Sequence, residues 1–223
     1  MPDTVTSNKI KYGLKNVHYA IATIGNDGEP AYGTVKPFPG AISVSLEPQG
    51  ERYVLHADNI EYYVNNDNQG YEGDLEMALI TEAVAMDLLG EEKDADNILY
   101  EEADAAAIHF ALLFQFEGDA KGVRHVFYNC TAARPTTGSE TKGESIEAKT
   151  ETLAITAKSA YFSAVEKNVV KARTADDTSD TIYNGWFSAV HTPTASATPA
   201  SSGSGSSSGS GSNSGSGTSG SGN

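Results

Sequence analysis

Apolar and polar positions alternate with a period of two along much of the chain, which is typical of half-buried β-strands. In residues 41–46, Ile42, Val44 and Leu46 fall on one face, and serines fall on the other. Pro48-Gln49-Gly50 is a turn signal. Residues 52–57 are therefore predicted to form the return strand of a hairpin with residues 41–46.

Further strands are predicted later in the chain. Residues 108–116 and 123–128 flank a Gly- and Asp-containing turn and predict a second hairpin. The Thr-rich residues 146–156 alternate weakly, and residues 161–170 are compatible with a last strand or a short helix. The pattern as a whole predicts a mainly β protein.

Residues 71–80 contain the most distinctive alternation in the chain. Read as a strand, this segment has three carboxylates on one face, Glu72, Asp74 and Glu76. Its other face is apolar and carries Tyr71, Leu75, Met77 and Leu79. Because side chains two apart on a strand share a face, the carboxylates repel one another. Such a face is expected to be in contact with water.

A helix is predicted directly after this segment. Thr81 is a suitable N-cap, Glu82 favours the helix dipole, and Gly90 supplies a C-terminal stop. Val84, Leu88 and Leu89 form one face that can cover a sheet. Leu75 and Leu79 also fit helical spacing, so the period alone leaves open a longer helix that begins at Asp74.

Charge is unevenly distributed along the 223 residues, whose formal net charge is −15. Residues 47–104 contain seventeen Asp and Glu against two basic residues, Arg52 and Lys93. Such a block disfavours adhesion to nucleic acid or anionic lipid, both of which require Lys and Arg. It is compatible with solubility, with cation binding, or with a surface past which nucleic acid moves without adhering.

Candidate catalytic chemistry is sparse. His56 and Asp58 are two apart on a predicted strand, a spacing more typical of a hydrogen-bonded surface pair than of a metal site. The acidic run from Asp94 lacks the glycine and glutamate that a calcium loop requires. No phosphate loop, dinucleotide fingerprint or nucleophile elbow occurs. We therefore expect no enzyme activity, and no catalytic, cofactor-binding or metal site.

Composition divides the chain into three parts. Residues 1–10 contain no apolar signal core and are expected to form an N-terminal arm. Residues 11–191 are expected to fold. Residues 192–223 are almost entirely Ser, Gly, Thr, Ala, Pro and Asn, and are expected to be a disordered tail. The single cysteine, Cys130, excludes an intrachain disulfide.

The order of segments resembles the major tail tube proteins of long, non-contractile-tailed phages, in particular those of Gram-positive hosts. The residues that carry this resemblance lie at 11–20, 39–50, 57–63, 68–76 and in the predicted helix at 81–90. The similarity covers most of the predicted folded part. It favours the strand interpretation of residues 71–77, because a turn precedes them and a capped helix follows.

The resemblance implies a β-sandwich or partial barrel with one flanking α-helix. It also implies long hairpins that join a ring-shaped inner β-barrel in stacked hexameric rings. The implied partners are other copies of the chain, a tape measure protein inside the tube, tail terminator and distal tail proteins, and DNA that passes through without specific binding. The protein would be made in host cytoplasm and located in the virion, with no membrane association.

Within the tube that the resemblance implies, two hypotheses concern the three carboxylates. Glu72, Asp74 and Glu76 would face the lumen, where six copies would form a wall that repels phosphate; alternatively, they would form salt bridges between stacked rings. For the whole chain, the alternative is a secreted or surface β-rich binding module with a Ser/Gly-rich linker.

Overall fold

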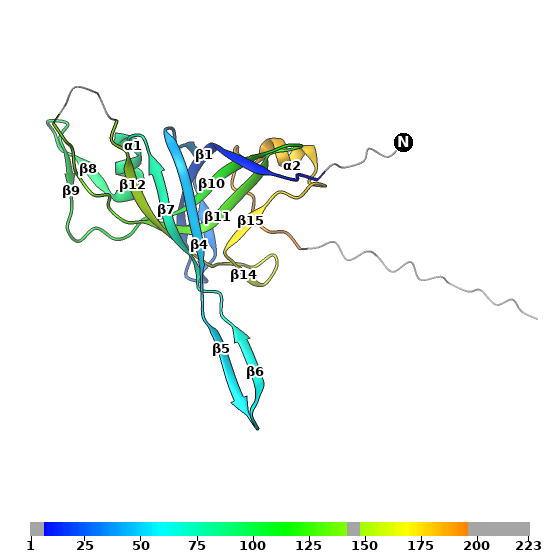
Figure 1. Ribbon diagram of the computed structural model, residues 1–223. Helices are drawn as coiled ribbons and strands as arrows, with labels where there is room; N and C mark the ends of the chain where they lie inside the picture. Colours follow the sequence, from blue (N-terminus) through cyan, green and yellow to red (C-terminus); the bar gives the residue numbers. More distant parts are fainter. Residues whose placement is uncertain (1–6, 142–147, 196–223) are drawn as a thin grey trace, which may run out of the picture.

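The computed structural model describes residues 7–141 and 148–195 (Figure 1). The strands are β1 (Lys11–Ile24), β2 (Pro30–Tyr32), β3 (Lys36–Pro37), β4 (Ala41–Gln49), β5 (Arg52–Ala57), β6 (Ile60–Asn66), β7 (Gly70–Met77), β8 (Glu91–Lys93), β9 (Leu99–Glu101), β10 (His109–Gly118), β11 (Val123–Ala132), β12 (Glu151–Lys158), β13 (Ala160–Phe162), β14 (Lys167–Val169) and β15 (Lys171–Arg173). The helical segments are α1 (Glu82–Val84), the π-helical turn η1 (Ala85–Leu89) and α2 (Asp180–Gly185). The prediction of a mainly β protein is confirmed.

One antiparallel sheet organises the protein, with the strand order β2-β1-β10-β11-β12-β7-β4. The sheet divides at β11, because the first half of that strand pairs with β15 and the second half pairs with β12. Within the described residues the sheet does not close into a barrel, and β4 ends the path. The predicted hairpin of residues 108–116 and 123–128 is confirmed as β10 and β11.

The two central strands are covered on both faces. On one face of β10, Phe110, Leu112 and Phe114 belong to a core that also contains Leu75, Leu153 and residues of the helix. On the other face, Ala111 and Leu113 pack with Tyr128, Phe162 and Trp186 in a second core. Burial on both faces explains why β10 is a nearly continuous apolar run without alternation.

The hairpin predicted between residues 41–46 and 52–57 is wrong in its pairing. Strand β4 pairs with β7, and β5 pairs with β6 in a separate two-stranded sheet. The turn at Asp58-Asn59 has positive φ at both residues, which matches the right-handed twist of a two-residue hairpin. Ile42 lies at a bulge and is exposed, so it does not share the inner face with Val44 and Leu46.

Strand β7 excludes the longer helix that would begin at Asp74. Helix α1 begins at Glu82, after Thr81 in extended backbone conformation, and Gly90 ends η1 at φ 73°. The structure buries Val84 and Leu88 in the first core, with Leu89 packed against it. Lys36 and Tyr19 both reach the Asp87 carboxylate at 2.6 Å, which fastens the helix to β1 and β3.

Other segments differ in detail from the predictions. The strand predicted over residues 146–156 is β12, which begins at Glu151; residues 146 and 147 lie outside the described part. Residues 161–170 contain β13 and β14 rather than a single element, and α2 was not predicted. The expected Gly/Ser tail falls mainly on residues 196–223, outside the described residues, as do residues 1–6 of the arm.

Candidate functional site

Strand β7 places three carboxylates on the outer face of the β12-β7-β4 part of the sheet. Glu72 and Asp74 are exposed and Glu76 is half-buried, whereas Leu75 and Met77 on the inner face are fully buried. Leu79 was expected on the apolar face but is 63% exposed. The reason is that β7 ends at Met77, so the alternation does not continue to Leu79.

Residues opposite these carboxylates are polar or small. Across the β4 and β12 pairs, Glu72 faces Glu47 and Thr156, Asp74 faces Ser45 and Ala154, and Glu76 faces Ser43 and Thr152. The hydroxyls of Ser43 and Thr150 donate to Glu76 at 3.0 and 2.8 Å. Among the described contacts, no Lys or Arg forms an ion pair with these three carboxylates. We call this outer surface the acidic face, comprising Glu47, Glu72, Asp74 and Glu76.

The β5-β6 hairpin adjoins the acidic face, since it connects β4 to β7. It projects away from the rest of the protein (Figure 1). Its two strands pair with each other rather than with the main sheet. The hairpin exposes six large side chains, Tyr53, Leu55, Ile60, Tyr62, Tyr63 and Val64, by 42–72%. Exposed apolar surface is typical of interaction sites.

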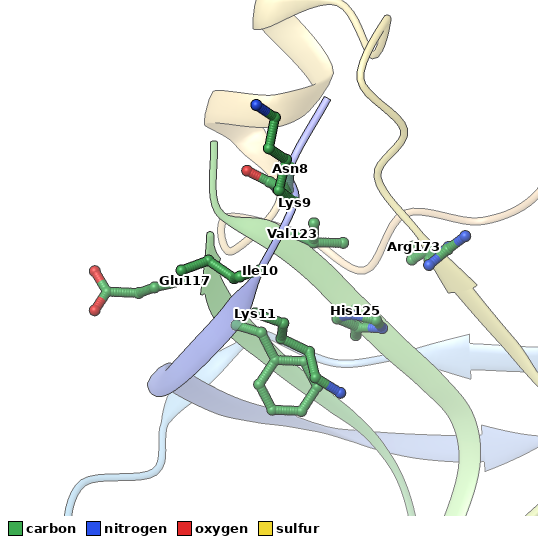
Figure 2. Close-up of a pocket in the computed structure, with 9 residues that line it drawn as sticks. Asn8, Lys9, Ile10, Lys11, Glu117, Val123, His125 and Arg173 are labelled. Carbon is green, nitrogen blue, oxygen red and sulfur yellow. The ribbon is translucent and has the colours of Figure 1, made fainter. Parts of the chain in front are cut away.

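Apart from the acidic face and the hairpin, a hollow surface lies where β1, β10, β11 and β15 meet. It is lined by Lys11, Phe116, His125, Lys171 and Arg173, which we call the cationic groove. Figure 2 shows one part of it, with Lys11, His125 and Arg173 contributed by three different strands. The sequence alone did not suggest this site. The available signal was the short alternation Lys171-Ala172-Arg173, but its relation to Lys11 depends on the fold.

His125 is stacked against Phe114, with ring centroids 5.2 Å apart, and its ring also contacts Phe116 edge-on. Burial lowers the pKa of His125 to about 4, and the positive charges of Arg173, Lys171 and Lys11 act in the same direction. The imidazole is therefore neutral at pH 7, and the positive charge of the groove comes from Lys and Arg alone.

The other candidate residues are not brought into a catalytic or metal-binding arrangement. Within residues 7–141 and 148–195, no group of three or more His, Cys, Asp or Glu side chains could hold a metal ion. The Asp94 carboxylate accepts hydrogen bonds from the backbone amides of Asp96 and Ile98, so it organises a turn. Cys130 is fully buried, and burial raises the pKa of its thiol to about 12. No helix in the described part has the length and apolar character needed to span a membrane.

Comparison with known proteins gives little. No protein-family model matches the chain, and no curated protein matches its sequence. Among solved structures, the chain is similar to the tube-terminating cap of the anti-feeding prophage, with a TM-score of 0.32. The two share 13% identity over 78% of this chain and 99% of that chain. A likeness this distant carries no argument about function. The proposed function therefore rests on the resemblance in segment order to tail tube proteins and on the geometry of the chain.

Proposed function

We propose that the protein is a structural subunit of a phage tail tube, which associates with copies of itself into stacked hexameric rings around a channel for DNA. The observation that carries this proposal is the projecting β5-β6 hairpin. Two-stranded hairpins are marginally stable by themselves in water. Here six large apolar side chains are more than two-fifths exposed, so the hairpin has surface that a partner would bury.

A second copy of the chain is a suitable partner. The β5-β6 hairpin follows directly after β4, which is the last strand of the main sheet. The unpaired backbone groups of the β4 edge therefore lie near the exposed apolar side chains of the hairpin. Sheets with open edges tend to pair with other chains, and closure into a ring removes the edges. In such a ring, hairpins from successive subunits would form the ring-shaped inner β-barrel, residues 11–191 would be the tube domain, and residues 192–223 a fringe.

The acidic face supports the location of the channel. Glu47, Glu72 and Asp74 form no ion pair among the described contacts, and a wall of such carboxylates repels phosphate. The repulsion acts mainly at short range, because the Debye length is ~10 Å at 0.1 M salt. Glu72, Asp74 and Glu76 are therefore proposed to face the lumen. DNA would pass without specific binding, the tape measure protein would occupy the lumen before ejection, and terminator and distal tail proteins would contact the tube ends.

In this role the protein is a virion component and has no enzymatic activity. A second candidate is a surface β-rich binding module. It is favoured by Tyr53, Tyr62 and Tyr63, three hairpin tyrosines that are more than half exposed and could stack on a ligand. The two candidates differ in self-association, because a binding module has no need to form rings.

Electron microscopy and sedimentation velocity of the purified protein test the proposal. Rings or tubes with six-fold symmetry are expected at high concentration. Leu55→Ser should prevent them without loss of monomer stability, since Leu55 contributes to no described core. Leu79→Ser is the matched control, because Leu79 is also exposed but lies off the hairpin. Assembly that survives Leu55→Ser, or a protein that remains monomeric at all concentrations, contradicts the proposal.

A further inference from the structure

The cationic groove is hollowed rather than flat. Two adjoining cavities of about 300 and 310 Å³ share Lys11, Phe116 and His125 as a common wall. Arg173 lines the first cavity, and Lys171 lines the second. Figure 2 shows His125 and Arg173 on neighbouring strands, with Glu117 directed away from them. A narrow segment of another molecule could enter such a hollow.

The positive charges of the groove are not neutralised within the described chain. Lys11, Lys171 and Arg173 form no ion pair among the described residues. Glu117 also lines the first cavity, but its carboxylate pairs with Lys15 at 2.7 Å. In a protein with a net charge of −15, three unpaired cations in one place are an unusual concentration of positive charge. They would attract a carboxylate-bearing partner.

Aromatic rings contact two of these three cations. The Lys11 ammonium lies 4.8 Å from the centre of the Phe116 ring, and the Lys171 ammonium lies 4.2 Å from that of Tyr71. Cation–π contacts of this kind position the charge without neutralising it. The groove therefore offers fixed positive charge beside apolar ring surface, which suits a segment with both carboxylates and apolar side chains.

The β8-β9 hairpin is such a segment. Residues 91–104 contain seven Asp and Glu against one Lys. Its tip is fixed, because Asp94 accepts hydrogen bonds from the amides of Asp96 and Ile98. Asp96 is exposed, and Ile98 and Tyr100 beside it are 61% and 47% exposed. In Figure 1 this hairpin lies at the left end of the protein, opposite the end that carries β15 and α2.

We propose that the cationic groove of one copy receives the β8-β9 tip of a second copy, with Asp96 meeting Lys11 and Arg173, and with Ile98 meeting the aromatic rings. This inference rests on the proposed self-association and names the surfaces that join neighbouring copies. Groove and tip lie at opposite ends of the folded protein, so the contact is head-to-tail. A head-to-tail contact repeats, and it gives a ring if the rotation closes and a filament if it does not.

The β5-β6 tip is the competing occupant. Both tips contain Ala-Asp-Asn-Ile followed by any residue and Tyr, at residues 57–62 and 95–100. The β5-β6 hairpin is less acidic, because its Glu61 is paired with Arg52 at 2.9 Å. The acidic face is broad and formed by sheet, so it does not fit a hollow. Charge and shape therefore favour the β8-β9 tip, and the two tips provide matched variants.

Two charge reversals in the full-length protein test the contact. Arg173→Glu replaces a positive charge of the groove with a negative one, and Asp96→Lys replaces a negative charge of the tip with a positive one. Each variant alone should lose self-association in sedimentation velocity by about tenfold or more, as expected for close charge pairs at an interface. An equimolar mixture should recover it, because the altered groove accepts the altered tip and the native groove accepts the native tip. Recovery by mixing would not result from a folding defect.

Control variants make the result specific. Lys167→Glu reverses an exposed lysine outside the groove, and this variant alone should keep the self-association of the wild type. Asp96→Asn should weaken association. Asp58→Lys tests the competing occupant. If this variant alone loses association and its mixture with Arg173→Glu recovers it, the groove receives the β5-β6 tip and the proposal is overturned.

The outcomes separate this inference from the proposed function. Six-fold rings that are unaffected by both reversals would refute the groove contact and leave the tail tube proposal standing. Filaments or small oligomers with recovery by mixing would support the groove contact and refute the tail tube. Wild-type protein that never associates would refute both.

Discussion

Glu47 of β4 lies directly opposite Glu72 of β7 in the antiparallel sheet, and both side chains are exposed. Like charges at directly opposed positions destabilise a strand pair. Neither residue forms an ion pair among the described contacts, so the isolated subunit carries this repulsion on its surface. The arrangement is consistent with a face whose role is to remain acidic rather than to contribute to stability.

Removal of one of the two charges should stabilise the isolated subunit. Glu72→Gln is expected to raise the free energy of unfolding by roughly 0.2–1 kcal/mol, the usual range for a cross-strand pair. Urea denaturation at low salt measures the change. The gain should shrink in high salt, because the repulsion is screened. Asp74→Asn is the control, since Asp74 faces Ser45 and Ala154, and its effect should be smaller.

Charge reversal at the three carboxylates of β7 should alter the passage of DNA if the acidic face lines a channel. In a phage whose tails carry Glu72→Lys, Asp74→Lys and Glu76→Lys together, DNA ejection should slow, because lysines bind phosphate. Ejection kinetics from particles with normal tails measure the effect. Reversal of Glu166, Asp177 and Asp180, three exposed carboxylates away from the acidic face, should leave the rate unchanged. Unchanged ejection by the first variant would argue against a role in the lumen.

Gly73 should tolerate no side chain. It lies between Leu46 and Ile155 in the sheet, and a Cβ there would collide with the backbone oxygen of Ser45. Gly73→Ala is therefore expected to destabilise the protein by about 1–3 kcal/mol, as over-packing does. Thermal or urea unfolding measures the loss. Gly138→Ala is the matched control, because nothing lies within 4 Å of the added Cβ, and it should be neutral.

Stability should depend on pH through His125. Its pKa is lowered to about 4 in the folded protein by burial and by Arg173, Lys171 and Lys11, against 6.5 ordinarily. Below pH 6.5 the unfolded chain binds a proton that the folded protein does not, so stability falls as pH falls from 6.5 to about 4. The loss is about 2 kcal/mol, from 1.36 kcal/mol per pKa unit reduced for partial exposure.

Urea denaturation of His125→Gln across this range isolates the contribution. The variant should lose that part of the pH dependence, whereas His56→Gln, on the projecting hairpin, should retain it. Equal slopes for wild type and His125→Gln would show that folding does not change proton binding by this imidazole.

Local pattern assigned residues correctly to the buried and wet faces of β7 once the segment was interpreted as a strand, although the period alone also allowed a helix from Asp74. The alternation of Leu75 and Met77 with Asp74 and Glu76 predicted the outer and inner faces of β7, because side chains of a strand point alternately to opposite sides. Thr81 and Gly90 likewise marked the ends of the helical segment. These features depend on neighbours within a few residues.

Pairing between distant segments was decided only by the tertiary structure. The turn at Pro48-Gln49-Gly50 predicted a hairpin, but β4 continues to pair with β7, and β5 turns back on β6 at Asp58-Asn59. The cationic groove combines Lys11 with His125 and Arg173, both of which lie more than a hundred residues after it in the sequence. The sequence by itself determined the mainly β class, the set of carboxylates that share one face of β7, and the ends of the helical segment. The partners of each strand, and the surfaces they leave exposed, follow from long-range packing that no local pattern encodes.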